Sequence, residues 1–318
     1  MVKVAIFPGQ GSQAVGMGRE LFEQSPEARA VFEEVDEALG EKLSTLIFEG
    51  PADALTLTAN TQPALMATSL AALRALEARA GRKLAELVTH VAGHSLGEYS
   101  ALAAVGALGI GDAARLLRIR GSAMQEAVAV GEGAMAAVLG LPIGAVEALA
   151  AEASGKDAVC DVANDNSDGQ VVISGSAAAV GDACALAKAR GAKRAMLLQV
   201  SAPFHCRLMQ PAAERLAQAL AGVRFMRPEC PVIANVLAEP VADPGIFADL
   251  LERQVTARVR WRETMAWIAA NGGDMLVEIG SGKVLTGLAR RAVPGAALAN
   301  ISTPDDIPSF LETLEGMA

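Results

Sequence analysis

The stretch Gly93-His94-Ser95-Leu96-Gly97 places one serine between two glycines, after a short apolar run and before an apolar helical one. This GxSxG pattern is typical of a nucleophile elbow, a sharp turn between strand and helix that exposes the serine hydroxyl. Backbone N–H groups at the start of the following helix can stabilise an oxyanion. The pattern predicts Ser95 as a covalent nucleophile; the alternative is a serine that only caps the helix.

Such a serine needs a general base, because its hydroxyl is hardly ionised at neutral pH. The chain has three histidines. His90 lies inside the expected strand, and His94 adjoins the serine in a turn where neighbouring side chains diverge. His205 lies far downstream, in a proline-containing loop before a helix. Elimination favours His205 as the base, although an ordinary loop or capping histidine is the alternative.

The elements around these residues alternate between strand-like and helix-like patterns. A strand over 2–8 and a Gly-rich loop lead into one helix over 19–39. A second helix over 60–80 carries a proline near its first turn, and a short strand over 87–93 precedes the serine. This order predicts an α/β protein.

The pattern changes between about residues 131 and 198. Strand, helix, two strands, helix and strand follow one another there, which is the order of a small ferredoxin-like α+β unit. We expect a catalytic body formed by residues 1–127 and 199–318, with a ferredoxin-like subdomain inserted at 128–198. The cleft between the two parts is the expected site.

Composition narrows the function classes. A net charge of −9 and an aromatic content of 3% disfavour binding to nucleic acid or to anionic membranes. The four cysteines show neither CxxC spacing nor a histidine cluster, so we expect reduced thiols and no metal site. No apolar stretch approaches the ~20 residues that span a bilayer, and the N-terminal apolar run is too short for a secretory signal. We expect a cytoplasmic protein.

Seven motifs occur together in an informative order. They are FPGQGSQ, NTQPAL, GHSLGEYSAL, RGSAMQEAV, NDNSDGQVVISG, SAPFH and IGSGKVLTGL. In order and spacing the chain resembles the malonyl-CoA:acyl carrier protein transacylases, acyltransferases of fatty acid and polyketide synthesis, over essentially its whole length. The resemblance implies an α/β-hydrolase-like body that carries the ferredoxin-like subdomain.

The resemblance also implies roles for the reacting groups. It assigns Ser95 as the acyl acceptor and His205 as the general base, oriented mainly by a backbone carbonyl at the position of Gln254. Gln10 and Leu96 match the residues whose backbone N–H groups form the oxyanion hole. The loop around Gln10 also resembles a phosphate-binding loop, but it lacks the lysine and the Ser/Thr of a P-loop.

Three further positions match substrate-binding residues of the family. Arg120 matches the arginine that holds the free carboxylate of the malonyl group, which a guanidinium can grip with two parallel hydrogen bonds. Asn164 matches a residue near the cleft, and Phe204 a bulky residue that crowds the space of an α-methyl group. The alternative roles are a charge on a solvated helix face for Arg120, hydrogen bonding within a turn for Asn164 and ordinary core packing for Phe204.

The implied reaction moves a malonyl group from malonyl-CoA to the phosphopantetheine thiol of holo acyl carrier protein, through a malonyl-serine ester. CoA and the carrier's arm are substrates, so no cofactor is expected. The alternatives are a GxSxG esterase or thioesterase, a transacylase of a polyketide or malonate decarboxylase pathway, and a non-enzymatic scaffold for carrier proteins.

A typically acidic carrier needs a basic cluster on the surface that binds it. The candidates are Arg190, Lys193 and Arg194; Arg258, Arg260 and Arg262; and Arg290 with Arg291.

Overall fold

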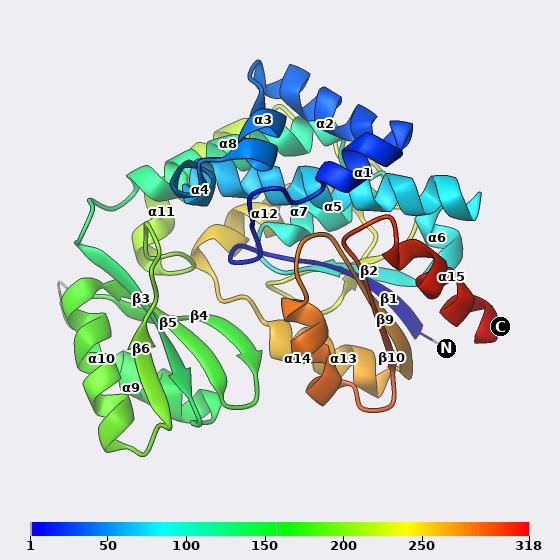
Figure 1. The fold of residues 1–318 in the computed structure, drawn as a ribbon. Helices are drawn as coiled ribbons and strands as arrows, with labels where there is room; N and C mark the ends of the chain where they lie inside the picture. The colour runs from blue at the N-terminus through cyan, green and yellow to red at the C-terminus, as the bar shows by residue number, and fades with distance from the viewer. Residues whose placement is uncertain (1, 157, 318) are drawn as a thin grey trace.

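The computed structural model describes residues 2–156 and 158–317, which form two β-sheets and the helices that cover them (Figure 1). The larger sheet has six strands in the order β10-β9-β1-β2-β7-β8. Its strands run parallel except β8, which is antiparallel to β7. The strand bounds are β1 Val2–Phe7, β2 His90–Gly93, β7 Val232–Ile233, β8 Pro240–Val241, β9 Gly273–Ile279 and β10 Ala297–Ile301.

Strand β1 divides its side chains between two cores, because successive residues of a strand point to opposite faces. Val4 and Ile6 pack with helices α13 (Trp261–Ala270) and α14 (Val284–Ala292). Ala5 and Phe7 join the larger core on the other face. The helices that contribute to that core are α1 Arg19–Gln24, α2 Pro26–Leu39, α3 Leu43–Glu49, α4 Ala52–Thr56, α5 Thr58–Ala80, α6 Leu84–Leu87, α7 Gly97–Ala104, α8 Ile110–Glu126, α11 Gln210–Leu220, α12 Phe247–Thr256 and α15 Asp306–Gly316.

The smaller sheet is antiparallel and has the order β4-β5-β3-β6. This order, with one helix after its first strand and one after its third, is that of a ferredoxin-like unit. The fold class predicted from the sequence is therefore confirmed, whereas the boundaries at 127/128 and 198/199 stay a prediction. The elements are β3 Gly133–Leu139, α9 Ile143–Ala153, β4 Cys160–Ser167, β5 Gln170–Ser176, α10 Ala177–Ala189 and β6 Arg194–Leu197.

Strand β4 fastens the smaller sheet to the body. Asp165 N donates to the carbonyl of Val259 at 3.0 Å, and Val259 N donates to the carbonyl of Ala163 at 2.9 Å. The carboxylate of Asp165 is fully buried and pairs with Arg262 at 2.9 Å. A buried carboxylate needs such charge-assisted bonds to offset its lost hydration. These contacts fix Asn164, which lies between the two bonded positions, at the junction of the smaller sheet and the body.

Two helices differ from the sequence-based expectation. The helix expected over 19–39 is broken at Ser25, whose Oγ accepts a hydrogen bond from Ala28 N at 3.2 Å and so caps α2. Pro26 occupies the first position of α2, because its ring cannot continue the preceding helix but suits a helix start. The helix expected over 60–80 begins earlier, at Thr58, so its proline lies inside α5 rather than in the first turn.

Two short 3₁₀ helices, Arg207–Met209 and Pro244–Ile246, complete the described elements. Within residues 2–156 and 158–317, no helix is both long enough and apolar enough to cross a bilayer.

The contact between the GxSxG turn and β1 gives the first prediction. A Cβ atom added at Gly97 would lie 2.3 Å from the carbonyl oxygen of Phe7, a backbone atom that cannot move aside cheaply. We expect Gly97→Ala to lower the free energy of unfolding by about 2–3 kcal/mol, measured by urea denaturation, because the turn must shift away from β1. Gly181→Ala in α10 is the control, since nothing lies within 4 Å of the new methyl group; it should stabilise by about 0.5–1 kcal/mol. Equal effects of the two substitutions would contradict the predicted clash.

Candidate active site

Ser95 lies in the turn between β2 and α7, with φ of 53°. This left-handed conformation is strained for a residue other than glycine. Two side chains hold the strained backbone on both sides: Asn235 Oδ1 accepts from Ser95 N at 2.8 Å, and Gln254 Nε2 donates to Ser95 O at 3.1 Å. Asn235 Nδ2 also donates to the carbonyl of Gly93 at 2.6 Å. The turn therefore has the features of a nucleophile elbow.

His205 reaches Ser95 from the loop between β6 and the 3₁₀ helix Arg207–Met209. Its Nε2 lies 2.7 Å from Ser95 Oγ, and its Nδ1 lies 2.9 Å from the carbonyl oxygen of Gln254. A carbonyl can only accept, so Nδ1 carries the proton and Nε2 presents its lone pair to the serine hydroxyl. His205 is itself strained, with φ of 57°. The structure thus brings together the predicted nucleophile, base and histidine-orienting carbonyl.

The imidazole of His205 is buried and neutral. Burial, and after it the nearby positive charge of Arg120, lower its pKa to about 3. The hydrogen bond to Gln254 acts against this shift but does not outweigh it. The ring therefore stays unprotonated, with the lone pair of Nε2 free, throughout the neutral range.

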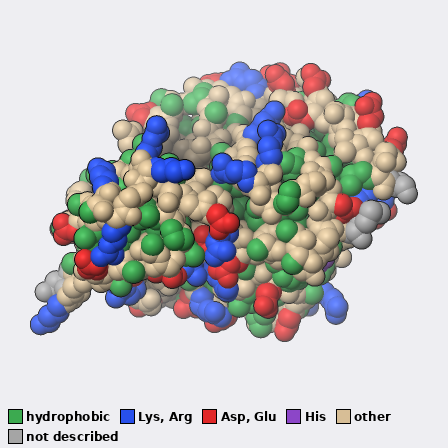
Figure 2. All heavy atoms as spheres, turned by 90° about the horizontal axis from the view of Figure 1, so that it is seen from below, with side chains coloured by type: hydrophobic (Ala, Val, Ile, Leu, Met, Phe, Trp, Pro, Cys, Tyr) green, Lys and Arg blue, Asp and Glu red, His purple; other side chains and the backbone are tan. Residues whose placement is uncertain are grey.

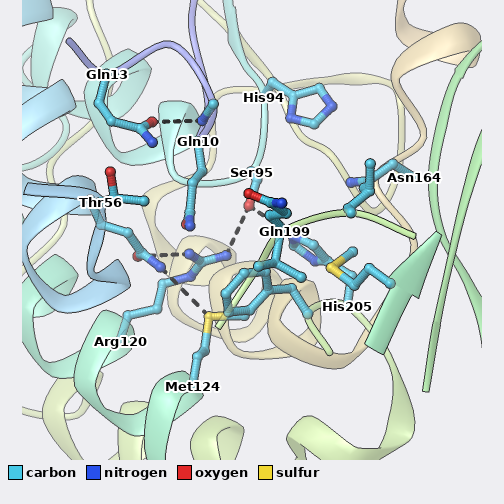
Figure 3. A pocket seen from close by; sticks show the side chains of 16 residues that line it. Gln10, Gln13, Thr56, His94, Ser95, Arg120, Met124, Asn164, Gln199 and His205 are labelled. Atoms are coloured by element: carbon cyan, nitrogen blue, oxygen red, sulfur yellow. Dashed lines mark hydrogen bonds between the residues drawn. The ribbon is translucent and has the colours of Figure 1, made fainter. Parts of the chain in front are cut away.

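Arg120, on α8, has a guanidinium group in the interior beside the serine, with 1% of the side chain exposed. Nη2 donates to Ser95 Oγ at 3.1 Å, and Nη1 donates to Gln62 Oε1 at 2.7 Å (Figure 3). Nη2 also donates to Gln254 Oε1 at 3.0 Å. Nε has no hydrogen-bond partner among the described residues. All its protein acceptors are uncharged, and this is the environment in which a guanidinium attracts an incoming carboxylate strongly.

Sequence reasoning missed Glu98 and Asn235, which lie beneath the reacting groups. Glu98 Oε2 accepts from Gln254 Nε2 at 2.6 Å and from Asn235 N at 3.1 Å. Burial raises the pKa of Glu98 to about 7, although the hydrogen bonds from Asn235 and Gln254 and the charge of Arg120 act against this shift. For Asn235, one signal was present in the sequence, since this residue follows a strand. Ser95 follows β2 and Asn235 follows β7, and these two strands are parallel neighbours in the larger sheet.

A cavity of about 310 Å³ opens over Ser95 between the two sheets (Figure 3). The predicted residues Asn164 and Phe204 line it, and both are 8% exposed. The other lining residues are Gln10, Gly11, Gln13, Thr56, Gln62, His94, Arg120, Met124, Met135, Leu198, Gln199, Val200 and His205. The pocket thus combines a nucleophile and a cation with apolar walls.

The loop that carries Gln10 lies against the serine turn. A Cβ atom at Gly9 would be 2.7 Å from the carbonyl oxygen of His94, so only glycine permits this approach. Among the described residues, neither Gln10 N nor Leu96 N donates a hydrogen bond to a protein acceptor. Both N–H groups are therefore available to an oxyanion.

The other two histidines, His90 and His94, make different contacts and do not act as the base of Ser95, as expected. His94 Nε2 is 2.8 Å from Asn166 Oδ1, and its ring packs on Trp261 with centroids 5.5 Å apart. His90 packs on Trp267 at 5.1 Å. His94 links the serine turn to β4 of the smaller sheet.

Comparison with known proteins defines the class. Residues 4–306 match the acyl transferase domain family, so the fold and the pocket are those of an acyl transferase. A relative from Bacillus subtilis, a malonyl CoA-acyl carrier protein transacylase, is 45% identical over 316 residues, which are 99% of this chain and 98% of that protein. The chain belongs to the family of malonyl CoA-acyl carrier protein transacylases, and the resemblance in its motifs is confirmed.

Solved structures agree with this assignment. An acyl-carrier-protein-S-malonyltransferase from Bartonella henselae is 56% identical, with a TM-score of 0.95 and coverage of 99% of this chain and 100% of that one. A malonyl-transacylase solved in complex with a type II PKS acyl-carrier protein is 40% identical, with a TM-score of 0.93 and coverage of 98% and 100%.

The neutral state of His205 gives a prediction that needs no assumption about substrate. We expect labelling of Ser95 by a fluorophosphonate to lack the loss near pH 6.5 that an ordinary histidine imposes, because the lowered pKa keeps His205 unprotonated. A histidine of pKa 6.5 would be about 97% protonated at pH 5 and labelling would fall about 30-fold. Labelling rates are measured by intact mass from pH 5 to 8.

Two variants serve as controls for that measurement. His205→Ala shows how much of the labelling depends on the base. Glu98→Gln removes the other ionisation near neutrality, since the pKa of Glu98 is raised to about 7. A 30-fold loss centred on pH 6.5 that persists in Glu98→Gln would show that the pKa of His205 is ordinary.

Proposed function

We propose that this chain transfers a malonyl group from malonyl-CoA to the phosphopantetheine thiol of holo acyl carrier protein, in fatty acid biosynthesis. The observation that carries the substrate is the 3.1 Å contact between the buried Arg120 guanidinium and Ser95 Oγ. A cation at this distance from the nucleophile places the free carboxylate of a short dicarboxylic acyl group beside its reacting thioester.

The first half-reaction uses the Ser95–His205 pair. Ser95 Oγ attacks the thioester carbonyl while His205 Nε2 takes the hydroxyl proton, and the N–H groups of Gln10 and Leu96 bind the developing oxyanion. Collapse breaks the carbon–sulfur bond, and His205 returns the proton to the departing CoA thiolate. The product is a malonyl ester on Ser95.

The second half-reaction reverses these roles with the carrier's thiol. His205 deprotonates the thiol, the sulfur attacks the ester carbonyl, and Ser95 recovers its proton. Asn164 and Phe204 line the acyl pocket in this proposal, and Phe204 crowds the position of an α-methyl group. The proposed reaction uses no resident metal or cofactor, because a thioester is already activated and the oxyanion hole carries the developing charge.

Basic side chains provide the surface for an acidic carrier. Ion pairs already engage Arg258, Arg260 and Arg262. In the cluster of Arg190, Lys193 and Arg194, Arg190 pairs with Glu152. Lys193 and Arg194 form no ion pair within the described part of the chain, and neither do Arg290 and Arg291, which favours these four side chains for docking. Figure 2 shows Lys and Arg side chains at the rim of a hollow on one face of the molecule.

A cytoplasmic location belongs to the same proposal. Its support is the set of four cysteines, all free and buried, as suits a reducing compartment.

The alternatives explain less of the site. An esterase or thioesterase would use Ser95 and His205 but gives Arg120 no role, and a scaffold for carriers requires neither. A transacylase of a polyketide or malonate decarboxylase pathway shares the chemistry, and the carrier that accepts the acyl group distinguishes it. Rates of transfer to fatty acid and polyketide carriers, compared side by side, decide between these pathways.

Intact-mass analysis tests the reaction directly. We expect malonyl-CoA to add one malonyl group to the protein and holo acyl carrier protein to remove it, because Ser95 forms an ester that only a bound thiol discharges. Ser95→Ala should acquire no adduct. Rapid hydrolysis of the adduct without a thiol would instead favour the hydrolase.

Substitution of the buried cation tests the substrate. Arg120→Ala should cut malonyl loading by ~10 to 1000-fold, from loss of charge-assisted hydrogen bonds to the carboxylate. Acetyl-CoA, which lacks the carboxylate, should not show this loss. Arg115→Ala is the control, since Arg115 lies on the same helix but is 53% exposed and pairs with Asp112. An unchanged preference for malonyl over acetyl in Arg120→Ala would rule out this role.

A further inference from the structure

Glu98 is a buried carboxyl group that the proposed reaction does not use. It lies on α7, three residues after the nucleophile, and is 1% exposed. Burial of a group that can carry a charge is costly unless hydrogen bonds or an opposite charge compensate for its lost hydration. The partners of this carboxyl group therefore indicate its role.

The contacts of Glu98 lead to Arg120 through Gln254. The side-chain amide of Gln254 uses both hydrogens of Nε2, one on Glu98 Oε2 at 2.6 Å and one on Ser95 O at 3.1 Å. Its oxygen Oε1 is left to accept from Arg120 Nη2 at 3.0 Å. The amide is therefore a polar bridge with one correct orientation.

The orientation matters because an amide has a donor end and an acceptor end. If the amide turned over, its NH₂ group would face the guanidinium, and two donors would meet. The acceptor oxygen of Glu98 opposes this turn, since it binds only the NH₂ end. Glu98 Oε2 is itself held in place by Asn235 N at 3.1 Å, so three segments of the chain meet at one oxygen atom.

We infer that Glu98 is a positioning residue for substrate selection: its Oε2 fixes the amide of Gln254, and this amide fixes Arg120 at the place where it receives the substrate carboxylate. The inference rests on the proposed function, because it assigns Glu98 to the malonyl-binding role of Arg120. The contact of Ser95 with Asn235 does not depend on Gln254, since the side chain of Asn235 binds Ser95 N and the Gly93 carbonyl directly.

Two substitutions separate the position of the oxygen from its charge. Glu98→Gln keeps an acceptor oxygen at the same distance from the backbone and removes the charge. Glu98→Asp keeps the charge and withdraws the oxygen by one methylene group. We expect the Gln variant to load malonyl within about threefold of the wild-type rate, and the Asp variant to lose about tenfold or more, the size of effect seen when a hydrogen bond to a charged group is lost.

The ratio of malonyl to acetyl loading is the decisive readout, because a general loss of structure would lower both rates together. We expect kcat/KM for malonyl-CoA to fall in Glu98→Asp with a rise in KM, while acetyl loading changes less than about threefold. Glu98→Met, which fills the same space without an acceptor, should behave like Glu98→Asp. It provides the same test if the Asp variant does not fold.

Glu278→Asp is the matched control. Glu278 is also a fully buried glutamate that accepts hydrogen bonds, from Leu285 N at 3.2 Å and Thr286 N at 2.7 Å, at the start of α14. Its shortening should lower the melting temperature without a change in the malonyl to acetyl ratio. A melting curve for each variant shows that the proteins compared are folded.

The outcomes are distinct. An unchanged ratio in folded Glu98→Asp and Glu98→Met would overturn the inference, and so would an equal loss in Glu98→Gln, which would show that the charge matters rather than the oxygen. Failure of the wild-type protein to form a malonyl adduct would instead contradict the proposed function itself.

Discussion

The site depends on a guanidinium group that is buried without a hydrogen-bonded carboxylate. Among the residues that the structure describes, Arg120 has only neutral acceptors, the amide oxygens of Gln62 and Gln254 and the hydroxyl of Ser95. Removal of such a group from water costs several kcal/mol unless strong hydrogen bonds compensate for its lost hydration. Helices α5, α8 and α12 each contribute to this arrangement, so the packing of the body serves to hold one cation in place.

A second consequence is that the reacting groups are strained and must be held. Ser95 and His205 both have positive φ angles, 53° and 57°, which cost of order 1–3 kcal/mol each for residues other than glycine. Amide side chains of Asn235 and Gln254 supply the hydrogen bonds that keep the serine backbone in this conformation. The carbonyl of Gln254 also holds the histidine, so one residue serves the nucleophile, the base and the cation.

The sequence alone predicted those parts of the site that can be recognised from a short motif or from a choice among few residues. The GxSxG turn identified Ser95, and elimination among three histidines reached His205. The positions of Arg120, Gln10 and Gln254 came only from resemblance, because an arginine on a helix or a glutamine at a helix end has many ordinary roles. The two-part fold was likewise predicted from a local pattern, the alternation of strands and helices along the chain.

Other features could not be read from the chain alone. Glu98 is in the motif, yet nothing local shows that its carboxyl group is buried against Gln254, because that contact joins residues 156 positions apart. The break at Ser25 was missed because the apolar period continues across it. The hydrogen bond from Ala28 N to the serine and the ring of Pro26 decide the outcome there.

The electrostatics of the pocket connect substrate choice with chemistry. After burial, the positive charge of Arg120 is the largest cause of the lowered pKa of His205. A base with so low a pKa accepts the serine proton only with difficulty. A carboxylate bound at Arg120 would offset this positive charge and raise the basicity of His205, because opposite charges close together in a buried site largely cancel. An acyl group without a carboxylate brings no such compensation. In the proposed reaction, the substrate carboxylate that Arg120 binds thus also offsets the effect of this guanidinium on the basicity of His205.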